Sequence, residues 1–269
     1  MKWLAPNIVV DGRTFAGPAR RPNSQADQDR YENDLLAIGG KIRQSAFGSR
    51  LLDLIGNNAQ PILIAPTTNP NNAGAQAFHG ADAFASGFQI PGPGGTVAGT
   101  GTGKGSMSLI LFNPHGSFGG IGPDTTLLHE ILHSYRQASG RWSPLPILPF
   151  VNPATVKNPA SEAVSFEHWE EWFSVVAEDI YAAETGATSV RTTHNPSFWF
   201  YTAVKPAGSP KNFFHPDAKT DSEEFADKYG LAILRILSQE PQIYNMMKDS
   251  KAWFNPVKDY EEQMLSSRT

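Results

Sequence analysis

Residues 127–136 read LLHEILHSYR and contain the pattern H-E-x-x-H, formed by His129, Glu130 and His133. On an α-helix, side chains four positions apart differ by about 40° of rotation, so His129 and His133 project from one face. Two imidazoles on one face can bind a single metal ion. The glutamate between them can reach a water molecule on that ion without being a ligand itself. The stretch therefore predicts a helix that carries a metal site of the hydrolytic type.

The flanking residues support a helix around this motif. Leu128, Leu132 and Tyr135 follow an i, i+4, i+7 spacing on a neighbouring face. We predict that Asp124 caps the N-terminus of the helix and that Gly140 ends it. The alternative is a chance match of the motif in an ordinary surface or core helix, and the surrounding pattern makes this the weaker interpretation.

The composition is that of an ordinary globular protein. Of the 269 residues, 40% are hydrophobic and 18% are charged, and the net charge is −4, which argues against nucleic acid as a partner. There are no cysteines, so any zinc must be held by histidines and carboxylates. No segment approaches the roughly 18 apolar residues of a membrane span, so we expect no membrane partner. Pro6 and Asn7 interrupt the first apolar run, so we expect synthesis in the cytoplasm without a signal peptide.

The chain divides into an N-terminal arm and one larger domain. Residues 1–24 are rich in Pro, Gly and Arg, and we predict that they form a flexible arm. Residues 25–269 are predicted to form a single domain. Its early part shows helical patterns over 24–40 and 45–55, followed by an apolar run over 61–66 that predicts a strand.

A Gly-rich stretch over residues 99–106 invites comparison with the phosphate-binding loop G-x-x-x-x-G-K-[ST]. Ala98 stands where this pattern needs the first Gly, and Gly105 stands where it needs Ser or Thr. We therefore expect no nucleotide site and interpret the stretch as a loop that leads into a strand over residues 106–112. In zinc peptidases a strand just before the motif helix commonly forms the sheet edge that pairs with substrate, and we consider this role beside that of an ordinary core strand.

A second strong helix is predicted over residues 168–184, and its largely apolar circumference indicates burial. Catalytic zinc usually takes three protein ligands and a water molecule, so a third ligand is needed. A third histidine in the extended pattern H-E-x-x-H-x-x-G-x-x-H is excluded because the corresponding positions hold Arg136 and Ser139. A carboxylate of the second helix is the remaining option. We prefer Glu171, with Glu170 as the first alternative and Glu178 or His168 as further ones.

Arg191 and His194 follow this helix and supply a cation and a neutral donor. Hydrolysis of an amide places negative charge on the carbonyl oxygen, and a donor held opposite the metal lowers the barrier. We therefore predict Arg191 and His194 as catalytic donors. The alternative for an isolated arginine is an ordinary ion pair.

These residues resemble the NleD-like effector metallopeptidases, which are zinc proteases that bacteria deliver into host cells. The resemblance spans roughly residues 100 to 262. It rests on Phe112-Asn113-Pro114, on Asp124 ahead of the H-E-x-x-H, Tyr135-Arg136 and Gly140, on Glu170-Glu171-Trp172 with Ile180-Tyr181, on Arg191 with His194, and on Phe254-Asn255-Pro256 with Tyr260. The resemblance implies a glutamate as third ligand, from the pair Glu170 and Glu171. His194 departs from the family pattern, which has a tyrosine at this place. Residues 221–239 and 241–250 are expected to form helices that complete the fold.

We thus expect an α+β fold of the zincin-like metallopeptidase type, mostly helical, with a small mixed sheet. Zn²⁺ would be bound by His129, His133 and Glu171 or Glu170, with Glu130 as general base. The predicted function is zinc-dependent cleavage of a protein or peptide substrate by a monomer, and the resemblance implies a bacterial effector or toxin that is secreted or injected into a target cell. Two alternatives are a catalytically inactive binding module with the same fold and a zinc hydrolase of a non-peptide amide.

Overall fold

The computed structural model describes residues 1–13, 24–58, 60–67, 73–77, 83, 103–116, 121–155, 165–166, 168–194, 202–205 and 220–267. The chain folds into two compact units, Met1–Ser143 and Pro144–Thr269, and each is described by itself. The described residues form a mixed, mainly helical α+β structure with a small mixed sheet, as the sequence predicted. The single domain predicted for residues 25–269 stays a prediction.

The first unit is built around a five-stranded sheet with the strand order β1-β2-β3-β5-β4. Its strands are β1 (Lys2–Ala5), β2 (Ile8–Val10), β3 (Ile62–Pro66), β5 (Ser108–Phe112) and β4 (Gly74–Ala77). The pairs β2–β3 and β3–β5 are parallel, and the outer pairs β1–β2 and β4–β5 are antiparallel. The predicted strands at 61–66 and 106–112 are therefore the neighbouring inner strands β3 and β5, which pair from Ile62 with Ser108 to Pro66 with Phe112.

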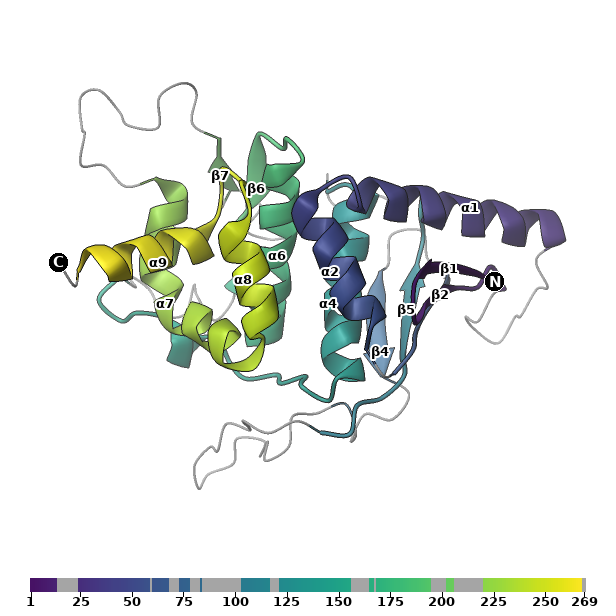
Figure 1. Ribbon diagram of the computed structural model, residues 1–269, viewed down its shortest axis with the longest axis horizontal. Coiled ribbons are helices and arrows are strands. Elements are labelled where there is room, and N and C mark those ends of the chain that lie inside the picture. Colours follow the sequence, from purple (N-terminus) through teal and green to yellow (C-terminus); the bar gives the residue numbers. More distant parts are fainter. Residues whose placement is uncertain are drawn as a thin grey trace. The chain divides into compact units, whose positions relative to one another are not determined.

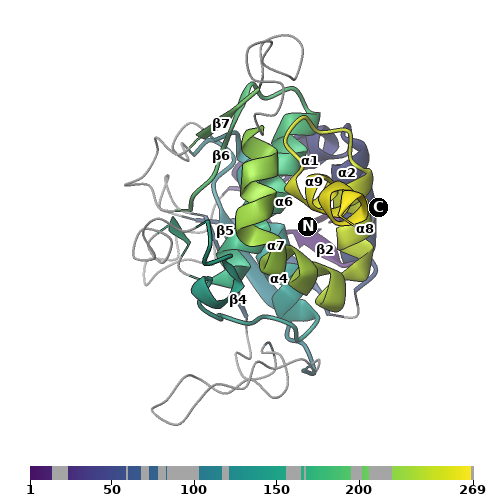
Figure 2. The same cartoon turned by 90° about the vertical axis from the view of Figure 1, so that its left-hand side faces the viewer.

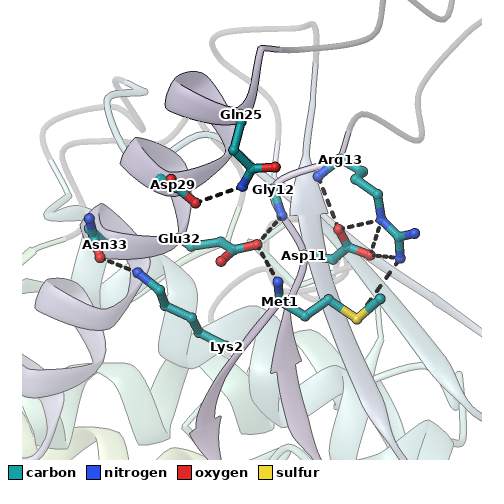
Figure 3. A network of polar contacts seen from close by, with 9 residues as sticks. All are labelled: Met1, Lys2, Asp11, Gly12, Arg13, Gln25, Asp29, Glu32 and Asn33. Carbon is teal, nitrogen blue, oxygen red and sulfur yellow. Dashed lines mark hydrogen bonds and ion pairs between the residues drawn. The ribbon is translucent and has the colours of Figure 1, made fainter.

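The prediction of a flexible arm was wrong for the first ten residues, which supply β1 and β2. Ile8 and Val10 are fully buried because β2 pairs with the inner strand β3. Figure 3 shows how polar contacts tie this hairpin to the next helix: Glu32 accepts a hydrogen bond from the backbone N–H of Gly12 at 3.1 Å and pairs with the amino group of Met1 at 2.8 Å. Long-range pairing thus orders these residues, and residues 14–23 of the predicted arm lie outside the described part.

Two helices follow, α1 (Gln25–Ile42) and α2 (Ala46–Gly56), and both agree with the sequence prediction. Each begins at a serine whose side chain accepts a hydrogen bond from a backbone N–H in the first turn: Ser24 from Asp27 and Ser45 from Gly48. Leu35, Leu51 and other apolar side chains of these helices are fully buried in the first unit.

The helix α4 (Pro123–Ala138) carries the H-E-x-x-H motif and packs on β3, β4 and β5. Figure 1 shows it beside β4 and β5. The predicted cap at Asp124 was wrong. Gly122 is the N-cap and Pro123, whose fixed φ suits the first helical position, starts the helix. Asp124 instead lies in the first turn, where a negative charge is favourable, and pairs with Lys41 of α1 at 2.7 Å.

Gly140 terminates α4, as predicted. Ser139 is the C-cap, and Gly140 follows it with a left-handed φ of +67°. The backbone of Gly103, in the segment that enters β5, approaches Gly140 closely, and its N–H donates a 2.8 Å hydrogen bond to the Gly140 carbonyl. A Cβ at position 140 would lie 2.5 Å from the Gly103 carbonyl carbon. Only glycine satisfies both the φ angle and this contact.

We expect Gly140→Ala to destabilise the protein by about 2 kcal/mol or more, because a left-handed φ and a backbone clash act together. Gly186→Ala is the matched control. Gly186 has a φ of +100°, compared with +67° at Gly140, and no atom lies within 4 Å of its added Cβ, so this variant reports a positive-φ cost without a clash. Denaturant unfolding of both variants measures the difference, and equal losses would contradict the role of the Gly103 contact.

The strand β5 is not a sheet edge, so that part of the sequence prediction was wrong. It pairs with β3 on one side and with β4 on the other, and β4 is the outer strand. The sequence of β4, Gly-Ala-Gln-Ala, has neither alternation nor strong β-formers, and its pairing with β5 therefore had no local signal.

The second unit is organised around α6 (Trp169–Glu184), which is buried along most of its length, as predicted. It is followed by the short hairpin β6 (Ser189–Arg191) and β7 (Thr202–Val204), and then by the helices α7 (Asp221–Gln239), α8 (Pro241–Asp249) and α9 (Pro256–Ser266). The helix α9 packs against α7 and α8 (Figures 1 and 2). The helices α7 and α8 agree with the prediction. The helix α9 was not predicted from the sequence, although Asn255 as N-cap followed by Pro256 is a typical helix start.

Aromatic side chains of α6 anchor this unit. Trp169 stacks on Phe173 with ring centroids 5.2 Å apart. The guanidinium of Arg235 lies 5.1 Å from the Trp169 ring and also 5.1 Å from the Phe150 ring. Phe150 belongs to the 3-10 turn η1 (Leu148–Phe150). The backbone N–H of Trp169 donates to the Leu145 carbonyl at 2.7 Å. This hydrogen bond joins the backbone at Leu145 to the first residue of α6.

Candidate metal centre

The two histidines of the motif face each other on the buried side of α4. His129 is 4% exposed and His133 is 7% exposed. Their Nε2 atoms lie 3.0 Å apart, and the rings meet edge to face at 76°. Two imidazole nitrogens at about 2.0–2.1 Å from one tetrahedral zinc ion would be separated by about 3.3 Å, so the observed spacing fits a shared ion. The prediction that both rings project from one face of the helix is confirmed.

The helix that carries these rings is held on the sheet by polar contacts as well as by packing. Ser108 of β5 lies with its Oγ 2.9 Å from Ser134 Oγ and donates to Gln137 Oε1 at 2.7 Å. All three side chains are buried. Arg136 is fully buried and donates to the Arg141 carbonyl at 2.6 Å, just beyond the helix end. Both the contact of α4 with β5 and the end of the helix are thus fixed, and the imidazoles sit on a rigid element.

Glu130 follows His129 directly on α4 and is 9% exposed. It is rotated by about 100° from His129 around the helix axis, so it lies beside the pair of imidazoles rather than between them. This placement suits a carboxylate that reaches a water molecule near the metal, in agreement with the role predicted for it. The role itself stays a prediction.

In the second unit, the two adjacent glutamates of α6 have different surroundings. Glu170 is fully buried, whereas the Glu171 side chain is 15% exposed. Part of the Glu171 side chain is therefore accessible, whereas none of the Glu170 side chain is. The assignment of Glu171 as the third ligand stays a prediction.

The other two candidates for the third ligand are engaged elsewhere. His168 is the N-cap of α6, and its Nδ1 accepts the backbone N–H of Glu171 at 3.4 Å. Glu178 is 1% exposed and forms an ion pair with the Nε of Arg191 on β6. Burial alone would lower the pKa of the Arg191 guanidinium, but the charges of Glu178, Asp179 and Glu171 together with the Glu178 hydrogen bond raise that pKa above its ordinary value. Arg191 is therefore a permanent cation.

His194 lies at the carboxylate of Glu171, with its Nε2 3.2 Å from Oε2. The sequence predicted Arg191 and His194 as donors to a substrate oxygen, and that role stays a prediction. An ion pair of Arg191 was the alternative left open by the sequence, whereas its partner Glu178 and the contact of His194 with Glu171 were not foreseen. A 13-residue separation between Arg191 and Glu178 carries no helical or strand periodicity that could have revealed them.

Ser165 and Thr193 are further residues that the sequence analysis missed. The Thr193 hydroxyl and the His194 N–H both donate to the Ser165 carbonyl at 2.9 Å. Thr193 is 4% exposed. Both hydrogen bonds are accepted by the same backbone oxygen, and no sequence pattern predicts such a contact.

Comparisons with known proteins identify no family for this chain. No protein-family model matches it, and no curated protein sequence does either. Among solved structures, the crystal structure of the Clostridium botulinum neurotoxin serotype F light chain is similar, with 13% sequence identity and a TM-score of 0.35 over 90% of this chain and 77% of that chain. A similarity of this size defines neither the fold family nor the activity. Within the described residues, no helix combines the length and apolar character needed to cross a membrane.

Proposed function

We propose that the chain is a zinc-dependent endopeptidase that hydrolyses peptide bonds in a protein substrate. The observation that carries the proposal is the pair of imidazole nitrogens 3.0 Å apart on the buried face of α4, with Glu130 beside them. Zinc bound at such a pair would polarise a carbonyl group and bring the pKa of a water molecule toward neutrality.

The proposed ligands are His129, His133 and Glu171. They offer two buried imidazoles and one half-buried carboxylate, with one ligand atom each. Three protein ligands of this kind leave a fourth position for water or substrate, which distinguishes a catalytic zinc site from a closed structural one. The chain has no cysteine, so the thiolate ligands of most structural zinc sites are excluded.

Glu130 is the proposed general base. Its carboxylate takes a proton from the attacking water and passes it to the nitrogen of the leaving amine. Arg191 is the proposed cation that stabilises negative charge on the carbonyl oxygen. Its ion pair with the buried Glu178 fixes the guanidinium on β6, and this fixed position is what such a role requires.

The resemblance to NleD-like effector metallopeptidases extends this proposal to the biological setting. It suggests a monomeric bacterial enzyme that acts on a protein of a target cell after secretion or injection. The support for this part is the set of residues that the resemblance shares, above all the Glu170-Glu171 pair and Arg191.

Replacing each of the two adjacent glutamates tests the ligand assignment. We expect Glu171→Gln to lose most of the bound zinc, because a neutral amide is a poor zinc ligand, with an affinity at least about 10–100-fold lower. Glu170→Gln is the matched control, with the same chemical change one position away, and it should keep one zinc per chain. Metal analysis after gel filtration and competition with a chromophoric chelator measure both, and circular dichroism verifies the fold.

The opposite pattern, with zinc lost in Glu170→Gln and kept in Glu171→Gln, would move the assignment to Glu170. If both variants bound zinc as tightly as the wild type, a carboxylate from this pair would not be a ligand and the proposed site would be refuted.

A further inference from the structure

The hairpin strand β6 and the residues after it carry two basic side chains, and each meets a carboxylate of α6. Arg191 pairs with Glu178, and His194 lies with its Nε2 3.2 Å from Oε2 of Glu171. The two carboxylates are seven residues apart, or about two helical turns, and therefore lie on the same side of α6. The segment 191–194 thus runs beside the face of α6 that presents Glu171.

His194 is held in this place by its own backbone. Its N–H donates to the Ser165 carbonyl at 2.9 Å, and the hydroxyl of Thr193 donates to the same oxygen at 2.9 Å. Ser165 and Thr193 are both buried. The ion pair of Arg191 with the buried Glu178 fixes the other end of the segment. The imidazole of His194 therefore approaches Glu171 from a fixed support rather than from an unattached loop.

His168, the other histidine near Glu171, caps α6 and is not hydrogen-bonded to the Glu171 carboxylate through its Nε2. The Nε2 of His168 is 3.8 Å from Oε1, which is longer than a hydrogen bond. Its Nδ1 accepts the N–H of Glu171 and so caps the helix. The two carboxylate oxygens are therefore not equivalent: Oε2 has a ring nitrogen within hydrogen-bond distance, and Oε1 is farther from its histidine.

We propose that His194 is a positioning residue for the metal ligand Glu171: its Nε2 holds Oε2 and so directs Oε1 toward the metal. This inference rests on the proposed zinc site. It assigns to His194 a contact with the ligand instead of the contact with substrate that the sequence suggested. Glu171 then binds through one oxygen, and the second oxygen is not available to occupy the position needed by water or substrate.

The physical reason is the freedom of the glutamate side chain. A glutamate can turn its carboxylate about the last bond and bind a metal through one oxygen or both. A hydrogen bond to one oxygen removes this choice and reduces the entropy lost on binding the metal. Such supporting partners of metal ligands typically change metal affinity by about 10–100-fold.

The test compares His194→Ala with His194→Gln in the full chain. The side-chain amide of glutamine can donate a hydrogen bond from about the position of Nε2, whereas alanine removes the donor. We expect His194→Ala to bind zinc about 10–100-fold more weakly and His194→Gln to stay close to the wild type. His115→Ala is the control for the loss of one surface imidazole, because this exposed residue pairs with Asp34 of α1 and should not change zinc affinity.

Cobalt replacing zinc gives a second readout that does not depend on activity. Four-coordinate Co²⁺ absorbs more intensely in the visible range than the five-coordinate ion, so we expect intense bands for the wild type and His194→Gln and weaker bands for His194→Ala. Unchanged zinc affinity and an unchanged cobalt spectrum in His194→Ala would overturn the inference and leave the zinc site intact. Equal losses in both variants would also overturn it, because the ring rather than its donor would then be required. A wild-type protein that binds no zinc would refute the proposed site itself.

Discussion

Glu130→Gln is expected to lower peptide cleavage by about 10³-fold while the protein keeps its zinc and its fold. Glutamine has nearly the same volume as glutamate, so a side chain that is 9% exposed on α4 can be replaced without a cavity or a clash. The change removes the basic oxygen that accepts the proton from water. It leaves the imidazoles of His129 and His133 in place, because their positions depend on the packing of α4 on the sheet.

The experiment compares kcat/KM of the wild type and Glu130→Gln on a peptide library, with zinc content measured on the same samples. New N-termini in a proteome treated with either protein then identify the substrate, since cleavages made by the wild type alone depend on Glu130. Cleavage by Glu130→Gln at the wild-type rate would refute the general-base role. If the wild type binds zinc but cleaves only non-peptide amides, it is a zinc hydrolase of that class. If it binds zinc and cleaves neither class of substrate, it is an inactive binding module.

Local signals predicted the helices α1, α2, α4, α6, α7 and α8, but α9 was missed. Ser24 and Ser45 as N-caps, Gly140 at a left-handed φ and the apolar faces of α1, α4 and α6 are all determined within one or two turns of the chain. A helix makes its hydrogen bonds within its own sequence, so its start and stop can be found there. The facing imidazoles of the H-E-x-x-H motif follow from the same local geometry.

The sheet was predicted less well because strand pairing is not local. The residues of β1 and β2 were assigned to an arm from the composition of the whole segment 1–24, although Ile8 and Val10 find their partners more than 50 positions later in β3. The placement of β4 beside β5 likewise depends on long-range strand pairing. The sequence of β4 has low β-propensity and gives no indication of this pairing.

The candidate site divides in the same way. The H-E-x-x-H motif and the double glutamate were visible in the sequence. The different surroundings of Glu170 and Glu171 were not visible there. They depend on the burial of each side chain and on the contact of Glu171 with His194, 23 positions later. Arg191 forms the ion pair that the sequence left open as an alternative, and only the structure identifies Glu178 as its partner. Contacts of this kind are set by the packing of β6 on α6, which no periodicity in the sequence encodes.

Zinc is expected to stabilise the wild-type protein by about 4 kcal/mol when its free concentration is about 1,000 times the dissociation constant, because an ion that binds only the folded state shifts the unfolding equilibrium by mass action. For a chain of this size we expect a rise in Tm of roughly 10 °C. The double variant His129→Ala/His133→Ala should show no zinc-dependent rise, since it retains neither imidazole of the pair whose Nε2 atoms lie 3.0 Å apart.

The comparison is made within each variant, with zinc and with a chelator, so the intrinsic cost of replacing two buried side chains cancels. His115→Ala serves again as the control, because it removes an exposed imidazole outside α4 and should keep the full zinc-dependent shift. A zinc-dependent shift of wild-type size in the double variant would place the metal elsewhere in the chain. Because the proposed role of Glu130 as general base requires water activated at this metal, such a result would also remove the physical basis for that role.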